Sequence, residues 1–89
     1  MSRAFVKEDQ DDVPIRYQLP PRDDPSFSQA AAWVLLEAAN LGDSPGAEAA
    51  TGYRWGDPAL RGEVEQILAY ARSRKDDRLE QLAERFLSA

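Results

Sequence analysis

The residues whose types could do chemistry are three pairs of adjacent carboxylates, Asp11-Asp12, Asp23-Asp24 and Asp76-Asp77. Paired carboxylates can hold Mg²⁺ or Ca²⁺, or act as general acid and base, when a fold fixes their separation. No EF-hand spacing surrounds these pairs. Asp24 and Asp77 also stand where the N-caps of helices are expected. The sequence therefore predicts capping and solvated acidic residues here, and no metal site.

Nucleophilic and acid–base catalysis lack the usual groups. The chain has no histidine and no cysteine, which removes the commonest general base and all thiol chemistry. Its two lysines, Lys7 and Lys75, lie in strongly charged segments. No serine stands in a nucleophile-elbow motif. We therefore expect a protein that is not an enzyme and that uses no cofactor.

The segment 52–58, "GYRWGDP", concentrates residue types that are enriched where proteins recognise one another. Tyrosine, tryptophan and arginine dominate interface hot spots, so Tyr53, Arg54 and Trp55 are candidate partner-binding residues. The alternative is that both rings fill the space between two helical hairpins, because a small core needs its aromatic side chains. In an extended segment, Tyr53 and Trp55 point to one side and Arg54 to the other.

A basic cluster occupies residues 72–78, "RSRKDDR". It could bind an anionic partner. It could also serve the negative end of a helix dipole and pair with the neighbouring aspartates, Asp76 and Asp77. No glycine-rich phosphate loop accompanies the cluster, which favours the second interpretation.

Four helices are predicted after residue 24. Asp24-Pro25, Ser44-Pro45 and Asp57-Pro58 each place a capping side chain before a proline, and Asp77 begins a weaker capping box. With glycines 42 and 52 as stop signals, the predicted helices run over about 25–41, 45–51, 58–74 and 77–87. We expect an all-α fold, a small bundle of about four helices that can be arranged as two helical hairpins. A faint similarity at an offset of 32 residues, which matches Leu36 with Leu68, agrees with that arrangement.

Residues 1–24 are expected to form an extended N-terminal arm beside a helical domain of residues 25–89. The arm holds three of the six prolines, and Pro20-Pro21 favours polyproline II geometry. Its tip, about 1–12, is expected to be mobile. Tyr17 and Leu19 belong to a period-2 apolar pattern, so one side of the arm should lie on the helical body or pair as a short edge strand. Tyr17 is a further candidate partner-binding residue.

Charge and hydropathy limit the classes of partner and the cellular location that we expect. The formal net charge is -5, which argues against direct binding of nucleic acid or of anionic membranes. No apolar run is long enough for a transmembrane helix and the N-terminus does not read as a secretory signal, so a cytoplasmic location is expected. Trp33 and Leu36 lie off the main apolar stripe of the first helix. This second face is either buried or the seam of a homodimer.

The opening "SRAFVKE", residues 2–8, resembles the first residues of some bacterial GreA/GreB-type transcription elongation factors. The resemblance covers those residues alone, and it implies that Arg3, Phe5 and Lys7 form a docking peptide for the transcription machinery. The rest of the chain lacks the family's long coiled coil and its β-rich domain. We expect a noncatalytic protein–protein interaction or accessory module of a bacterial cytoplasm. The alternatives are a self-associating homodimer and a factor that docks on RNA polymerase through its arm.

Overall fold

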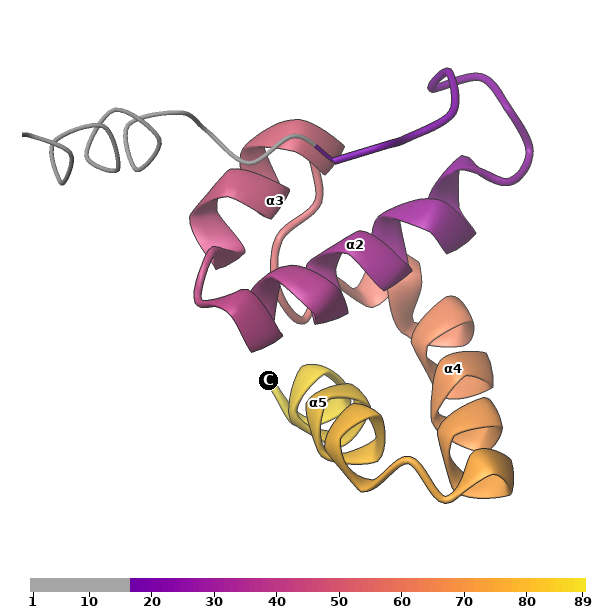
Figure 1. Cartoon of the computed structure of the whole chain (residues 1–89). Helices are drawn as coiled ribbons and strands as arrows, with labels where there is room; N and C mark the ends of the chain where they lie inside the picture. The colour runs from indigo at the N-terminus through magenta and orange to yellow at the C-terminus, as the bar shows by residue number, and fades with distance from the viewer. Residues whose placement is uncertain (1–16) are drawn as a thin grey trace, which may run out of the picture.

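The computed structural model describes residues 17–89, and within them it is built from helices without a strand. The all-α prediction is thereby confirmed, and the predicted tip of the arm lies outside the described residues. The elements are α2 (Phe27–Leu41), α3 (Ser44–Thr51), the 3₁₀ turn η1 (Pro58–Leu60), α4 (Arg61–Arg74) and α5 (Asp77–Ser88). The elements α2 and α3 follow one another as a hairpin, as do α4 and α5 (Figure 1). Helix α2 also packs on both α4 and α5, so it joins the two hairpins.

Helix α2 occupies the centre because it is apolar on most of its circumference, as its sequence "AAAWVLL" predicts. Fully or nearly fully buried side chains line it from end to end, and they meet the apolar faces of α4 and α5. The buried hydrophobic residues are Phe27, Ala31, Ala32, Val34, Leu35, Leu36, Ala38, Ala47, Leu60, Val64, Ile67, Ala71, Leu82, Ala83 and Phe86.

The same turn closes both hairpins. Gly42 ends α2 in the left-handed region at φ 79°, and Lys75 ends α4 there at φ 59°. In each turn the next residue, Asp43 or Asp76, donates its N–H to the carbonyl five positions back, at 2.8 Å and 2.9 Å. This is the Schellman arrangement that satisfies the last carbonyls of a helix. Each aspartate is then the N-cap residue of the following helix.

Because Gly42 and Lys75 occupy the same place in the two turns, the two hairpins are related by an offset of 33 residues. The sequence comparison suggested an offset of 32. At this offset, four of the seven buried residues of α2 match buried residues of the second hairpin. The pairs are Phe27 with Leu60, Ala31 with Val64, Val34 with Ile67, and Ala38 with Ala71. The two hairpins therefore share a turn and one of the buried stripes before it, whereas the buried Ala32, Leu35 and Leu36 of α2 have no buried counterpart in α4.

The predicted helix start at residue 77 is confirmed, whereas the start predicted at residue 25 is two residues too early and the start predicted at residue 45 is one residue too late. Helix α2 begins at Phe27 because the Asp24 carboxylate accepts hydrogen bonds from the Ser26 N–H (2.8 Å) and Ser26 Oγ (2.7 Å), which close a separate turn. These two bonds, the backbone one first, lower the pKa of Asp24. The N-cap of α3 is Asp43 instead of Ser44, and the N-cap of α5 is Asp76 instead of Asp77.

The Asp57-Pro58 start is confirmed, since the Asp57 carboxylate accepts from the Ala59 N–H at 2.9 Å. The first turn after it is 3₁₀ in geometry, and the α-helix proper begins at Arg61. Among the described residues, no helix has the length and apolar character that crossing a membrane requires.

Candidate partner-binding surface

The loop between α3 and η1 is held by side chains of α3. Thr51 is fully buried; its hydroxyl donates to the Ala47 carbonyl at 2.8 Å and accepts from the Tyr53 N–H at 3.1 Å. The Glu48 carboxylate accepts from the Trp55 N–H at 2.8 Å. These bonds hold the backbone at both aromatic positions, Tyr53 and Trp55.

Both rings turn toward the helical body. Tyr53 lies against Phe27 of α2, with ring centroids 6.3 Å apart. Trp55 meets Phe86 of α5 edge to face at 5.0 Å. Tyr53 and Trp55 are half-buried and pack on the core, whereas Arg54 between them is exposed. The alternative in which the rings fill the space between the hairpins is thus the one that the structure shows, and of the three candidates only Arg54 lies fully on the surface.

Tyr17 also has a structural role. Its hydroxyl donates to the Asp43 carboxylate at 2.7 Å, which ties the arm to the turn between α2 and α3. Burial, followed by the bond to Asp43, raises the pKa of Tyr17 to about 12. Tyr17 and Leu19 pack on the core while Gln18 is exposed, as the period-2 pattern predicted. The other arm candidates, Arg3, Phe5 and Lys7, lie outside the described residues, as does the segment that carries the elongation-factor resemblance.

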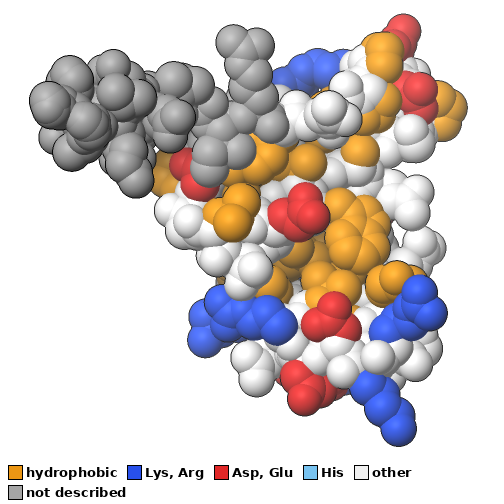
Figure 2. Space-filling view, in the orientation of Figure 1, with side chains coloured by type: hydrophobic (Ala, Val, Ile, Leu, Met, Phe, Trp, Pro, Cys, Tyr) orange, Lys and Arg blue, Asp and Glu red, His pale blue; other side chains and the backbone are white. Residues whose placement is uncertain are grey.

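A different surface brings aromatic side chains into the open. Trp33 of α2 is half-buried and meets Tyr70 of α4 edge to face, with centroids 5.8 Å apart and planes at 79°. Tyr70 is 46% exposed. The Arg74 guanidinium lies over the Tyr70 ring, 5.3 Å from its centre. Figure 2 shows the resulting apolar surface in the middle of the molecule, with charged side chains around it.

The surface is hollowed on both sides of Trp33. One hollow, of about 340 Å³, lies between α2 and the start of α5. We call it the Trp33 groove. Its lining consists of Trp33, Leu36, Glu37, Asn40, Asp76, Arg78, Leu79 and Leu82. A second hollow, of about 440 Å³, is lined by Gln29, Trp33, Glu63, Gln66, Ile67 and Tyr70. Trp33 is therefore the wall that the two hollows share.

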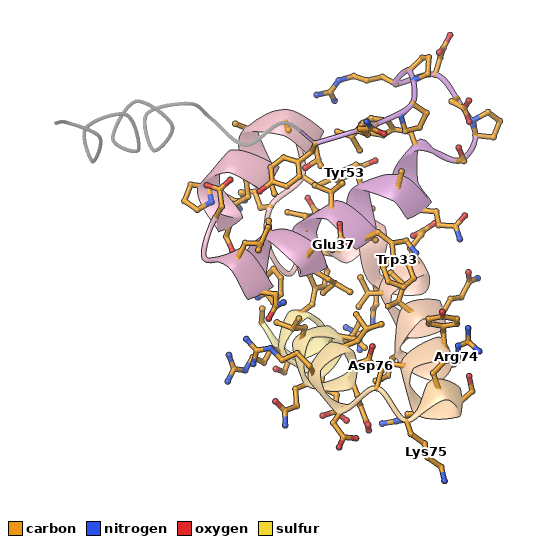
Figure 3. The ribbon with its side chains drawn as sticks, viewed as in Figure 1. Trp33, Glu37, Tyr53, Arg74, Lys75 and Asp76 are labelled. Carbon is orange, nitrogen blue, oxygen red and sulfur yellow. The ribbon has the colours of Figure 1, made fainter. Side chains whose placement is uncertain are left out.

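The charges of the Trp33 groove differ in how far they are already engaged. Arg78 is held, because its Nε donates to Asn40 Oδ1 at 2.8 Å. Asp76 accepts from the Leu79 N–H at 3.1 Å as the α5 cap, which leaves its second oxygen free for another donor. Glu37 is exposed and makes no ion pair or side-chain hydrogen bond with any residue that the structure describes. Glu37 and Asp76 come from different elements, α2 and the turn before α5 (Figure 3), and both line the groove.

The basic cluster at residues 72–78 is divided by the fold. Arg72 makes ion pairs with Glu80 and Glu84, both at 3.2 Å, and these bonds raise its pKa. Arg74 stacks on Tyr70. Of the cluster's four cations only Arg78 lines the Trp33 groove. The structure therefore contains no single basic patch at this position.

The expected homodimer seam through Trp33 and Leu36 needs correction. Leu36 has no exposed surface, because α5 covers this side of α2. Trp33 alone reaches the surface. Tyr70, its neighbour, was missed by sequence reasoning, because it is one aromatic residue in a helix with several charged side chains. Its place follows only from the crossing of α2 over α4.

The described surface presents the aromatic side chains of Trp33 and Tyr70 beside two hollows. Within residues 17–89, no group of three or more histidine, cysteine or acidic side chains is placed to hold a metal ion. Comparisons with protein-family models, with curated proteins and with solved structures find no match for the chain. Its function is therefore argued from the surface itself.

Proposed function

We propose that this protein is a noncatalytic interaction module that binds another protein through the Trp33 groove and the adjoining face of Tyr70. The observation that supports the proposal is the use of its aromatic residues. Phe27, Tyr53, Trp55 and Phe86 are all joined in ring pairs that pack on the core. Tyr70 also forms a ring pair, with Trp33, but it is left 46% exposed beside a hollow.

Such a surface suits a partner better than a small substrate. Exposed aromatic side chains beside arginine are the residue types that supply most interface energy. The Trp33 groove and the hollow beside Tyr70 share Trp33 as a wall, so a protruding side chain of a protein partner could enter either of them. The module would act by holding a partner and not by transforming a substrate.

The test compares two exposed apolar residues. Tyr70 is 46% exposed and Leu41, at the end of α2 and outside both hollows, is 63% exposed. Wild-type protein, Tyr70→Ser and Leu41→Ser are immobilised and used to capture proteins from a lysate of the source cells. We expect a partner that Leu41→Ser retains and that Tyr70→Ser loses by about tenfold or more, as for a hot-spot residue.

Leu41→Ser removes mainly surface that faces water, so this variant should keep its melting temperature within a few degrees of wild type. Tyr70→Ser also loses the edge-to-face contact with Trp33, so both baits are compared at a temperature at which circular dichroism shows that they are folded. The proposal is wrong if no protein is captured above a blank matrix, or if the captured protein is retained equally by all three baits.

A further inference from the structure

We propose that the Trp33 groove recognises a cationic segment of the partner protein, with an arginine or lysine side chain laid over Trp33 and its charge near Glu37 and Asp76. This inference rests on the proposed function and names the chemistry of the partner. It is carried by the identity of the residues that line the groove and by what each is already bonded to.

The floor of the groove suits the stem of a long cationic side chain. The half-buried Leu79 supplies apolar surface in the groove next to Trp33, and the buried Leu36 and Leu82 support it from the core. Arginine and lysine bury their methylene stems along such surface while the charged head stays near water. Tryptophan is also the aromatic residue that attracts a cation most strongly over its face. The same protein already uses this contact twice, since Arg22 lies over Phe27 and Arg74 over Tyr70.

The rim of the groove supplies the matching charge. Glu37 and Asp76 are two carboxylates against one guanidinium, Arg78, and Arg78 is bonded to Asn40. Glu63 adds a third carboxylate in the hollow on the other side of Trp33. An arginine or lysine of the partner could form an ion pair with Glu37 without breaking any bond between described residues.

The charge of the whole chain acts in the same direction. At a net charge of -5 the protein attracts cationic segments from a distance and repels acidic ones. Steering of this kind raises the association rate and falls with ionic strength. An acidic peptide would have to approach against this field and then meet the carboxylates of the groove. The cationic partner is therefore the one that both the local and the overall charge favour.

The test uses a defined probe and the full chain. The probe is a synthetic ten-residue peptide in which arginine and leucine alternate in pairs, and its match has glutamate at every arginine position. Each is titrated into ¹⁵N-labelled protein while the indole N–H signals are followed by NMR. Trp33 and Trp55 give the two such signals, and Trp55→Phe identifies them.

We expect the arginine peptide to shift the Trp33 signal in a saturable manner, and the glutamate peptide to leave it in place. Glu37→Lys should weaken the binding of the arginine peptide by about tenfold, because a carboxylate that contacts the peptide is replaced by a cation that repels it. Asp23→Lys changes the net charge by the same amount at an exposed position outside the groove and should weaken it less than about threefold. Both residues are exposed, so neither substitution should unfold the chain.

Three results would overturn the inference: equal binding of the two peptides, equal losses for Glu37→Lys and Asp23→Lys, or a shift confined to Trp55. The lysate experiment separates this failure from that of the proposed function. If Tyr70→Ser still loses a captured protein while the arginine peptide does not bind, the module stands and its partner is not cationic. If the lysate yields no partner, both proposals fall.

Discussion

Two glycines with open space around them should respond to the same substitution with opposite signs. Among residues 17–89, apart from the adjacent residues and the helix's own backbone, no heavy atom lies within 4 Å of the position where a Cβ would stand at Gly42 or at Gly62. A replacement by alanine therefore meets no neighbour at either site. The difference lies in the backbone, because Gly42 has φ 79° in the turn after α2 while Gly62 lies within α4.

The expected magnitudes follow from that difference. An alanine at position 42 takes on the left-handed strain of an L-residue, roughly 1–2 kcal/mol. Restricting the unfolded chain returns about 0.4–1 kcal/mol. Gly42→Ala should thus lower the free energy of unfolding by about 0.5–1 kcal/mol. Gly62→Ala carries no strain and should raise it by about 0.5–1 kcal/mol.

Lys75 offers the reverse test, since it bears the same left-handed strain at φ 59° in the equivalent turn. Lys75→Gly relieves the strain but loses a favourable charge at the end of α4, so a gain of about 0.5 kcal/mol is expected. Urea unfolding and thermal melts followed by circular dichroism measure all three variants. A change of 1 kcal/mol moves the melting temperature of a domain this small by about 4–8 °C. If Gly42→Ala stabilises the protein as Gly62→Ala does, the reasoning about the turns is refuted.

Two further predictions concern the arm and the loop. Because the pKa of Tyr17 is raised from 10.0 to about 12, its hydrogen bond to Asp43 contributes fully below pH 10 and is lost as the pH rises through 12. Tyr17→Phe should therefore lower the free energy of unfolding by about 1 kcal/mol at neutral pH. The variant should also lose less stability than wild type as the pH rises. If the free energies of unfolding of the two proteins change in parallel from pH 8 to 12, this reasoning is contradicted. In the loop, Trp55→Ala should lower the free energy of unfolding by about 2 kcal/mol through its contact with Phe86, whereas Arg54→Ala should change it by less than about 0.5 kcal/mol; similar urea midpoints for the two variants would count against the packing role of the ring.

Sequence signals located the helices well where one residue type has one structural meaning. Glycines 42 and 52 end α2 and α3, and Asp57 before Pro58 caps the next element. The signals failed where two neighbouring residues could play the same part. Asp76 and Asp77 are adjacent aspartates, and only the backbone shows that the first accepts from the N–H of Leu79. The left-handed Lys75 has no signal at all, because lysine rarely adopts that conformation.

The candidate surface was harder to predict than the fold. Alternation in the loop gave the shared direction of Tyr53 and Trp55, but their burial depends on Phe27 and Phe86, which come from opposite ends of the helical region. The Trp33 groove joins α2 to residues some 38 positions later, as in the bond from Arg78 to Asn40. Periodicity within one helix carries no information about which helix will cross it, so Trp33 could be marked as unusual while its neighbours could not.

The two ring pairs of the loop have a consequence for how the molecule opens. Tyr53 packs on Phe27 of the first hairpin, and Trp55 packs on Phe86 of the second. Each hairpin closes through contacts that are near in sequence, which by itself would allow two separately melting units. Because one short loop contacts both hairpins, the hairpins cannot separate without breaking the Tyr53–Phe27 or the Trp55–Phe86 contact. Amide protons of α2 and α5 should then exchange with solvent at the same limiting free energy, as a single cooperative unit.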